Sequence, residues 1–215
     1  MTKDTLLQQA VLAELNWEPR VTASHIGVSA DNGVVTLTGH VENFAERRAA
    51  EAAVGRVSGV KAVVEKIEVR IPFAMRRTDD RIAAAVLERL AWDVVVPQDR
   101  VKVKVENGGI TLAGDVDWNF QSEAAEDACR RMQGVVSVLN QIAIKPQLSA
   151  SNVHEKIMIA LHRSWYAPMK IKVTADGGKV RLTGSVRTWC ERQEAETAAW
   201  GAPGVTMVDD AIVID

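Results

Sequence analysis

Apolar residues recur at helical spacing near the start of each third of the chain. Leu7, Val11 and Leu15 fall on one face of a helix that is expected to begin near Asp4 or Thr5. Two later segments have the same spacing, with apolar faces formed by Ile82, Val86 and Leu90 and by Val153, Ile157 and Leu161. Their candidate N-caps are Asp79 or Asp80 and Ser151 or Asn152. The pattern predicts three amphipathic helices.

A tryptophan and then a proline follow each of these helices. Proline removes a backbone donor and clashes with the preceding turn, so it ends a helix. The prolines are Pro19, Pro97 and Pro168, and the tryptophans are Trp17, Trp92 and Trp165. We expect the tryptophans to close one end of the core.

Alternating apolar and polar residues then predict a pair of strands in each third. Residues 26–30, 101–105 and 171–175 form the first strands, and one face of each is polar, which indicates a sheet covered on one side only. The second strands carry inward pairs such as Val35 and Leu37. The two strands are joined by Asn32-Gly33, Asn107-Gly108 or Gly177-Gly178. Such dipeptides are typical of hairpin turns because they accept positive φ.

An alanine-rich helix and a third strand complete each unit. The helices are expected over about 43–57, 118–132 and 187–200, and the strands over 61–69, 137–144 and 206–214. A helix that crosses from the second strand to the third allows these strands to lie parallel with a right-handed connection. The sequence therefore predicts an α+β fold of tandem αββαβ modules, each a three-stranded mixed sheet with two helices on one face.

Two glycines mark the same places in every unit. Gly39, Gly114 and Gly184 end the second strand, 75 and 70 residues apart, and a valine follows two residues later. Twenty residues further on, Gly59, Gly134 and Gly204 are expected to end the second helix. A fixed period of this kind indicates duplicated modules. We assign them to residues 1–71, 72–146 and 147–215, with short linkers at Pro72 and at 145–149.

Composition excludes several classes of protein. Apolar residues make up 47% of the chain and charged residues 25%, which is ordinary for a soluble globular protein. The formal net charge of −2 argues against a nucleic-acid binder, which usually has a basic face. Gln8, Gln9 and Glu14 interrupt the first apolar segment, so a secretory signal is not indicated. Cys129 and Cys190 occupy non-equivalent positions and are expected to be buried free thiols. The protein is expected to be cytoplasmic.

Each module resembles the BON (bacterial OsmY and nodulation) domain. The residues that carry the resemblance are Gly39-His40-Val41, Gly114-Asp115-Val116 and Gly184-Ser185-Val186, with the later pairs Gly59-Val60, Gly134-Val135 and Gly204-Val205. The resemblance implies an αββαβ fold and a binding role without enzymology. It also implies association with phospholipid membranes, often in envelope or osmotic-stress proteins. A cytoplasmic BON–LysM type senses potassium. The glycines are structural positions of the family, so no catalytic residue carries over.

No motif indicates catalysis, a cofactor or a metal. The sequence has no phosphate-binding GxxxxGK[ST] loop, no cysteine pair at zinc spacing and no serine-centred nucleophile elbow. His154 and His162 lie eight residues apart, whereas two helical zinc ligands need a spacing of four. His25 and His40 are interpreted as lone surface residues. We therefore expect no enzyme.

Two kinds of surface residue are candidates for lipid or partner binding. Outward lysines form short basic ribbons on the open sheet faces, at Lys102 and Lys104 and at Lys170 and Lys172. Aromatic residues lie near the starts of two alanine-rich helices, at Trp118, Phe120 and Trp189, with Arg187 and Arg192 beside the last. Rings of this kind are favoured at a lipid interface, but they could equally pack against a neighbouring module. The arginine pairs Arg47-Arg48 and Arg130-Arg131 are expected to form solvent-facing i,i+4 ion pairs.

The sequence thus predicts a binding or scaffolding protein. It would associate peripherally with an anionic phospholipid surface or a protein partner, under osmotic or envelope stress, without a transmembrane segment. The alternative is a cytoplasmic sensor of potassium or a small ligand.

Overall fold

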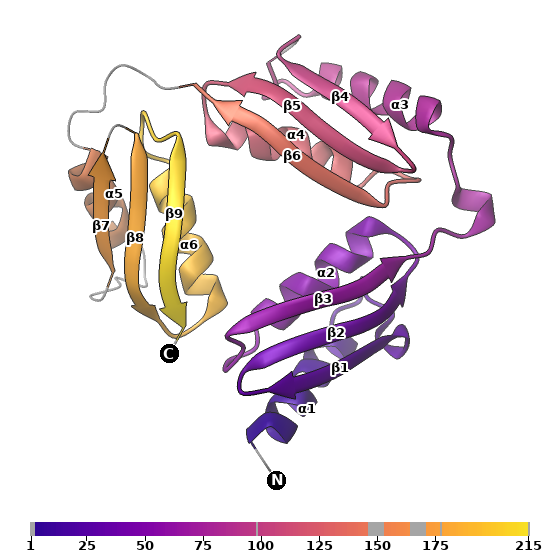
Figure 1. The fold of residues 1–215 in the computed structure, drawn as a ribbon, viewed down its shortest axis with the longest axis horizontal. Helices are drawn as coiled ribbons and strands as arrows, with labels where there is room; N and C mark the ends of the chain where they lie inside the picture. The colour runs from indigo at the N-terminus through magenta and orange to yellow at the C-terminus, as the bar shows by residue number, and fades with distance from the viewer. Residues whose placement is uncertain (1–2, 98, 146–152, 164–170, 177, 215) are drawn as a thin grey trace.

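Each third of the chain folds into its own sheet with two helices behind it (Figure 1). The computed structural model describes residues 3–97, 99–145, 153–163, 171–176 and 178–214. Module 1 contains α1 (Lys3–Trp17), β1 (Ile26–Asp31), β2 (Val34–Val41), α2 (Phe44–Gly55) and β3 (Ala62–Val69). A short 3-10 turn, η1 (Ala23–His25), precedes β1. The predicted order αββαβ is confirmed.

Modules 2 and 3 repeat this order. Module 2 begins with the 3-10 turn η2 (Phe73–Met75) and continues with α3 (Asp79–Trp92), β4 (Val101–Glu106), β5 (Gly109–Val116), α4 (Asn119–Arg130) and β6 (Ser137–Ile144). Module 3 has α5 (Val153–Arg163), β7 (Lys172–Asp176), β8 (Lys179–Val186), α6 (Trp189–Trp200) and β9 (Met207–Ile214). The strands agree with the predicted ones to within one residue at most ends.

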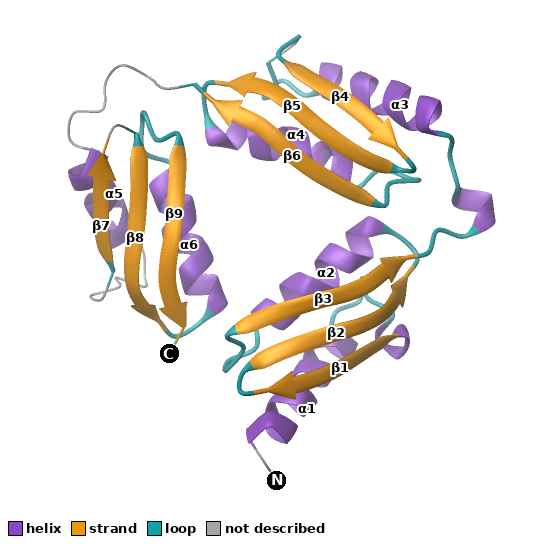
Figure 2. Cartoon of the chain, viewed as in Figure 1, coloured by secondary structure: helices purple, strands orange, loops and turns teal. Residues whose placement is uncertain are grey.

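The sheets are mixed, as predicted. The strand orders are β1-β2-β3, β4-β5-β6 and β7-β8-β9. In each sheet the first pair is antiparallel and the second parallel. Both helices of a module cover the same face of its sheet, and the other face is open (Figure 2). The fold therefore leaves one face of each sheet uncovered by its own helices.

The core of each module lies between its helices and its sheet. In module 1, Val11 and Leu15 of α1 meet Val35 and Leu37 of β2, and all four are fully buried. The predicted stripes of α3 and α5 are buried in the same way. Alanines of the second helices, such as Ala53, allow those helices to lie close to the sheet.

Each second strand continues for two residues beyond the glycine that was expected to end it, and a close backbone approach requires that glycine. Gly39, Gly114 and Gly184 have φ of 120°, 130° and 131°, a region in which side chains are strained. A Cβ on Gly39 would lie 2.0 Å from the carbonyl oxygen of His25, and one on Gly114 would lie 2.0 Å from that of Arg100. The motif is therefore a steric requirement for pairing the first two strands.

The sequence predicts that the later glycines end the second helices, and this prediction is wrong. The helices end at Gly55, Arg130 and Trp200, and the glycines follow four residues later at φ near +90°. Gly59 lies against the hairpin glycine Gly33, whose Cβ would be 3.2 Å from the Gly59 carbonyl oxygen. The pair of glycines brings two turns together so that the chain can enter β3.

The aspartate at the start of the first helix of modules 1 and 2, which is α1 and α3, also has an unexpected role. The sequence predicts Asp79 or Asp80 as the N-cap of α3, but Thr78 occupies that position and makes no side-chain capping bond. The Asp79 carboxylate instead accepts hydrogen bonds from Asn107 N at 2.8 Å and Gly108 N at 2.9 Å. Asp4 accepts from Asn32 N in the same way, at 2.9 Å. These carboxylates fasten the first helix to the hairpin turn.

Candidate surfaces for lipid or partner binding

The tryptophans at the ends of α1 and α3 are on the surface, so the expectation that they close the core is wrong. Trp17 is 83% exposed and Trp92 is 80% exposed. Each lies two residues after the last buried leucine of its helix, Leu15 or Leu90. Two residues rotate a helix by about 200°, so the ring points away from the sheet. Trp165 lies outside the described residues.

Other apolar side chains extend this exposed surface at the end of α3. Val94 is 98% exposed and Leu87 is more than half exposed. Next to them, Leu90, Val96 and Pro97 line a shallow hollow of about 290 Å³. We call Leu87, Trp92 and Val94 the apolar end of module 2. These exposed apolar side chains are close in sequence and are candidates for an interaction site.

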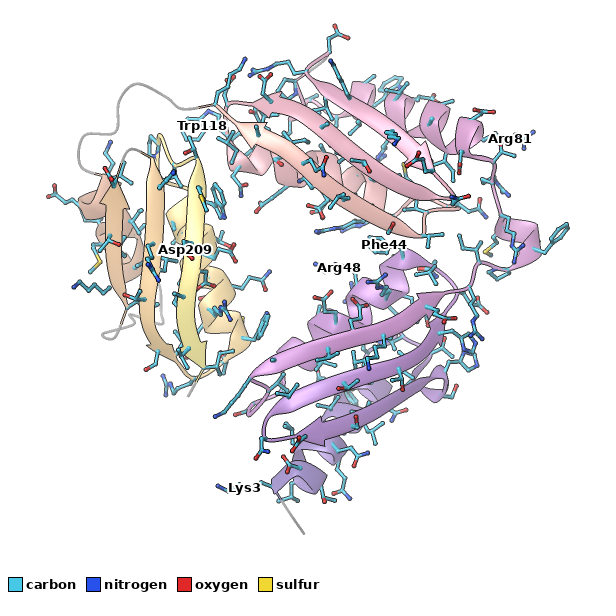
Figure 3. The ribbon with its side chains drawn as sticks, in the orientation of Figure 1. Lys3, Phe44, Arg48, Arg81, Trp118 and Asp209 are labelled. Atoms are coloured by element: carbon cyan, nitrogen blue, oxygen red, sulfur yellow. The ribbon has the colours of Figure 1, made fainter. Side chains whose placement is uncertain are left out.

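The predicted lysine ribbons lie on the open sheet faces. Lys102 and Lys104 are exposed on β4, and Lys172 is exposed on β7. Lys104 Nζ lies 3.0 Å from Glu106 Oε1, an exposed pair in which water screens the attraction. On β9, Asp209 pairs with Arg181, and Figure 3 shows it on the open face of module 3. Acidic groups therefore accompany the basic ones. Lys170 lies outside the described residues.

Trp118 and Phe120 lie together at the start of α4. Their ring centroids are 6.3 Å apart, and Phe120 is more than half exposed while Trp118 is half-buried. The side chain of Gln121 accepts hydrogen bonds from the backbone N–H groups of Asp117 and Trp118, both at 3.1 Å. The turn is thus held in place with an aromatic ring displayed beside it. Lipid contact by these rings stays a prediction.

Trp189 and Arg192 take part in packing within the chain. The indole lies against the backbone of Gly55 in module 1, where an added Cβ would be 3.3 Å from Trp189 Cδ1. The Arg192 guanidinium lies 5.4 Å from the indole centroid, and its Nε donates to Asp210 Oδ2 at 2.6 Å. Arg187 is highly exposed and lies 3.7 Å from Glu191. Of the predicted cluster around Trp189, Arg187 is therefore the most accessible member.

The first residue of the second helix contacts a neighbouring module in two of the three copies. Phe44 is the first residue of α2, and its side chain, 7% exposed, packs with the core of module 2. Trp189 is the first residue of α6 and contacts module 1. The corresponding residue of α4 is Asn119. Sequence alone could align these positions, but it could not show which neighbour each ring would meet.

Modules 1 and 2 carry different charged residues at the end of the sheet where the first strand begins and the second strand ends. In module 2, Arg100 binds Asp115 and Asp117, each at 2.7 Å, and Lys145 also binds Asp115 at 2.7 Å. Hydrogen bonds from Lys145 and then Arg100 lower the pKa of Asp115, and those from Arg100 lower that of Asp117. These groups stay ionised in the folded protein across the neutral range.

The equivalent place in module 1 holds two histidines. His25 and His40 stack with ring centroids 4.8 Å apart. The strand register explains this, because Ile26 pairs with Gly39 and their outer neighbours face each other. The interpretation of the two histidines as lone residues was wrong, and counting back from the hairpin turn would have found the pair.

The two thiols differ in environment. Both are free, but Cys129 is buried and Cys190 is exposed, so the expectation of two buried thiols holds only for Cys129. Burial raises the pKa of the Cys129 thiol to about 12, which keeps it protonated and unreactive.

The expected arginine pairs are only partly found. Arg130 binds Glu126 and Asp127 at helical spacing, and Arg48 binds Glu51. Arg47, however, reaches across to Glu65 on β3.

Among the described residues, no group of three or more histidine, cysteine, aspartate or glutamate side chains is placed to hold a metal ion. None of the described helices is long and apolar enough to cross a membrane. The side chains of His154 and His162 are outside the description.

A tandem array of αββαβ modules, each with a three-stranded mixed sheet and one open sheet face, defines a class of modular repeat protein. The chain belongs to the BON domain family, whose domain matches residues 3–71, 78–146 and 149–215.

Three relatives place the chain within that family. The osmotically-inducible protein Y of Escherichia coli is 32% identical over 66% of this chain and 73% of its own length. The outer membrane lipoprotein DolP of Haemophilus influenzae is 33% identical over 59% of this chain and 64% of its own length. A 21 kDa hemolysin of Actinobacillus pleuropneumoniae is 27% identical over 65% of this chain and 73% of its own length.

Proposed function

We propose that this protein is a non-enzymatic BON protein that associates peripherally with anionic phospholipid surfaces. The observation that carries the proposal is the exposure of apolar side chains at the apolar end of module 2, led by Trp92 and Val94. Amphipathic rings such as indole are favoured at the boundary between headgroups and acyl chains. The names of two relatives, an outer membrane lipoprotein and an osmotically-inducible protein, support a role in envelope or osmotic stress.

Charge would add to the apolar contact. Lys102 is exposed at the start of β4, and β4 follows the loop after Trp92. A basic side chain near an anionic membrane contributes about 1 kcal/mol, and salt screens the contribution. The association is therefore expected to be weak, reversible and sensitive to ionic strength.

Vesicle co-sedimentation tests the proposal. The full-length chain is mixed with vesicles of phosphatidylcholine alone or with phosphatidylglycerol, at low and at physiological salt. We expect binding to the anionic vesicles only, reduced by salt and reduced at least fivefold in Trp92→Ser. Leu139→Ser is the matched control, because Leu139 is also an exposed apolar residue of module 2 but lies on the open face of β6. Absence of binding under every condition would refute a membrane role.

The same proposal includes a cytoplasmic location, which cell fractionation would test. A protein partner remains the second occupant of these surfaces.

The alternative function, a potassium or small-ligand sensor, predicts a rise in melting temperature with added potassium, because a ligand that binds the native state stabilises it.

A further inference from the structure

Helices α2 and α4 belong to different modules and line a cleft of about 650 Å³. Four arginines lie along it, with Arg20 and Arg48 from module 1 and Arg130 and Arg131 from module 2. Small alanines of α2 lie between them, so the guanidinium groups are the largest side chains of the cleft. Figure 3 shows Arg48 projecting from α2 on the side turned away from β3.

Carboxylates accompany the arginines of this cleft. Glu46 and Asp127 line it with them, and Glu18, Glu51 and Glu126 beside it bind Arg20, Arg48 and Arg130. The Glu46 carboxylate is buried and accepts hydrogen bonds from the backbone N–H groups of Thr22 at 2.8 Å and Glu42 at 3.1 Å. Asp127 is bound by Arg130 at 2.7 Å. Because Glu51 binds Arg48, Arg131 is the arginine of the cleft that has no carboxylate partner among the described residues.

The arginines also retain unused donors. The Arg131 side chain is exposed and forms no hydrogen bond or ion pair within the part of the chain that is described. Arg48 uses Nη1 for Glu51, and Arg20 uses Nε and Nη2 for Glu18. Both Nη groups of Arg130 are bonded, but its buried Nε has no acceptor among the described residues. A guanidinium has five N–H donors in a planar fork that matches the oxygens of a phosphate.

We propose that this arginine cleft binds a multivalent oxyanion of the phosphate type that bridges modules 1 and 2. Each module supplies two arginines, so neither module alone presents the full set of donors. Phe44 packs α2 against module 2 beside the cleft, which sets the two helices at a fixed separation. The site lies on the helical side, whereas Lys102 and Lys172 lie on open sheet faces, so it does not depend on the proposed function.

The phosphate groups could come from a soluble polyphosphate or from a lipid headgroup. Titration calorimetry of the full chain with inorganic tripolyphosphate, at low salt, tests the soluble source. We expect saturable binding of one equivalent, at least tenfold weaker in Arg48→Gln/Arg131→Gln. Lys66→Gln/Arg81→Gln is the matched control, since it also removes two exposed positive charges but at sites outside the cleft (Figure 3 labels Arg81 on α3). Circular dichroism verifies that both variants are folded.

Sedimentation with phosphatidylglycerol vesicles distinguishes the second source. If tripolyphosphate does not bind but the cleft variant binds these vesicles at least fivefold more weakly than the control variant, the site takes a lipid headgroup. If Trp92→Ser no longer binds vesicles but still binds tripolyphosphate, the cleft is a phosphate site independent of the proposed membrane-binding surface. Equal binding by the cleft and control variants with both probes, or no binding of either probe by the natural protein, would overturn the proposal.

Discussion

Replacement of Gly114 by alanine should disrupt the sheet of module 2. The new Cβ would lie 2.0 Å from the carbonyl oxygen of Arg100 and 3.1 Å from its carbonyl carbon. Both atoms are backbone at the start of β4, so no side chain can move aside. β4 would have to shift by about 1 Å to restore an ordinary contact, and this would weaken its hydrogen bonds with β5. The residue would also remain at a φ of 130°.

The expected loss is large for a module of this size. A side chain held in a backbone region that favours glycine costs about 1–3 kcal/mol, and the displaced strand adds to that. We therefore expect module 2 to lose about 3 kcal/mol of unfolding free energy. For a domain of 60–100 residues this corresponds to a fall of roughly 12–24 °C in melting temperature.

Hydrogen exchange followed by mass spectrometry measures this effect module by module. Peptides from β4 and β5 should lose protection in Gly114→Ala, while those of module 1 keep it. Gly201→Ala is the matched control, because Gly201 has a right-handed helical φ of −71° and an added Cβ would come no closer than 3.6 Å to other atoms. If the two variants unfold within about 0.5 kcal/mol of each other, the steric explanation of the repeated glycine is wrong.

Three further predictions follow from other contacts. Hydrogen bonds from Arg20 and Arg56 lower the pKa of Glu18 from 4.5 to about 2, so its stabilising effect is complete above pH 4.5 and is lost as the pH falls towards 2. Glu18→Gln should therefore lower the melting temperature at pH 7 and have no effect near pH 2. Phe44→Ala removes a buried ring at the junction of modules 1 and 2 and should cost about 3 kcal/mol and increase the radius of gyration in small-angle scattering. Asp79→Ala removes two hydrogen bonds to the hairpin turn and should cost about 1–2 kcal/mol in chemical denaturation.

Each of these has a result that contradicts it. A Glu18→Gln difference that persists unchanged to pH 2 would exclude the ion pairs as its cause. A Phe44→Ala chain with unchanged scattering would show that the ring does not hold the modules together. The control is Asp80→Ala, because the Asp80 carboxylate is exposed on the same helix. If Asp79→Ala were no less stable than this control, the hydrogen bonds from the hairpin turn to Asp79 would not contribute to stability.

The fold was largely predictable because three copies confirm one another. Alternation of apolar residues, the hairpin dipeptides and the recurring glycines are local signals, and each occurs at the same place in every module. The parallel pairing of β2 with β3 also followed, since a crossover helix leaves little choice of connection. The errors lay at element ends. Gly59 was interpreted as a helix cap because a glycine after a helix usually is one, whereas here its partner is Gly33 in another turn.

The candidate surfaces were less predictable, for two different reasons. The exposure of Trp17 and Trp92 was within reach, because each lies two residues beyond a buried leucine and so on the opposite side of the helix. The hydrogen bond that Arg192 makes could not be predicted, because its acceptor, Asp210, lies 18 residues away on β9. Such a contact depends on how a helix lies over a sheet, and periodicity does not report that.

The sequence by itself determined the module, its repetition and the residues that fill each core, because these depend on contacts within about 70 residues and on backbone sterics. Only the tertiary structure decided how the modules meet. Phe44 and Trp189 occupy one position of the repeat, yet one packs with module 2 and the other with module 1. The arginine cleft arises from that arrangement, because its two pairs of arginines come from two modules that only their packing brings together.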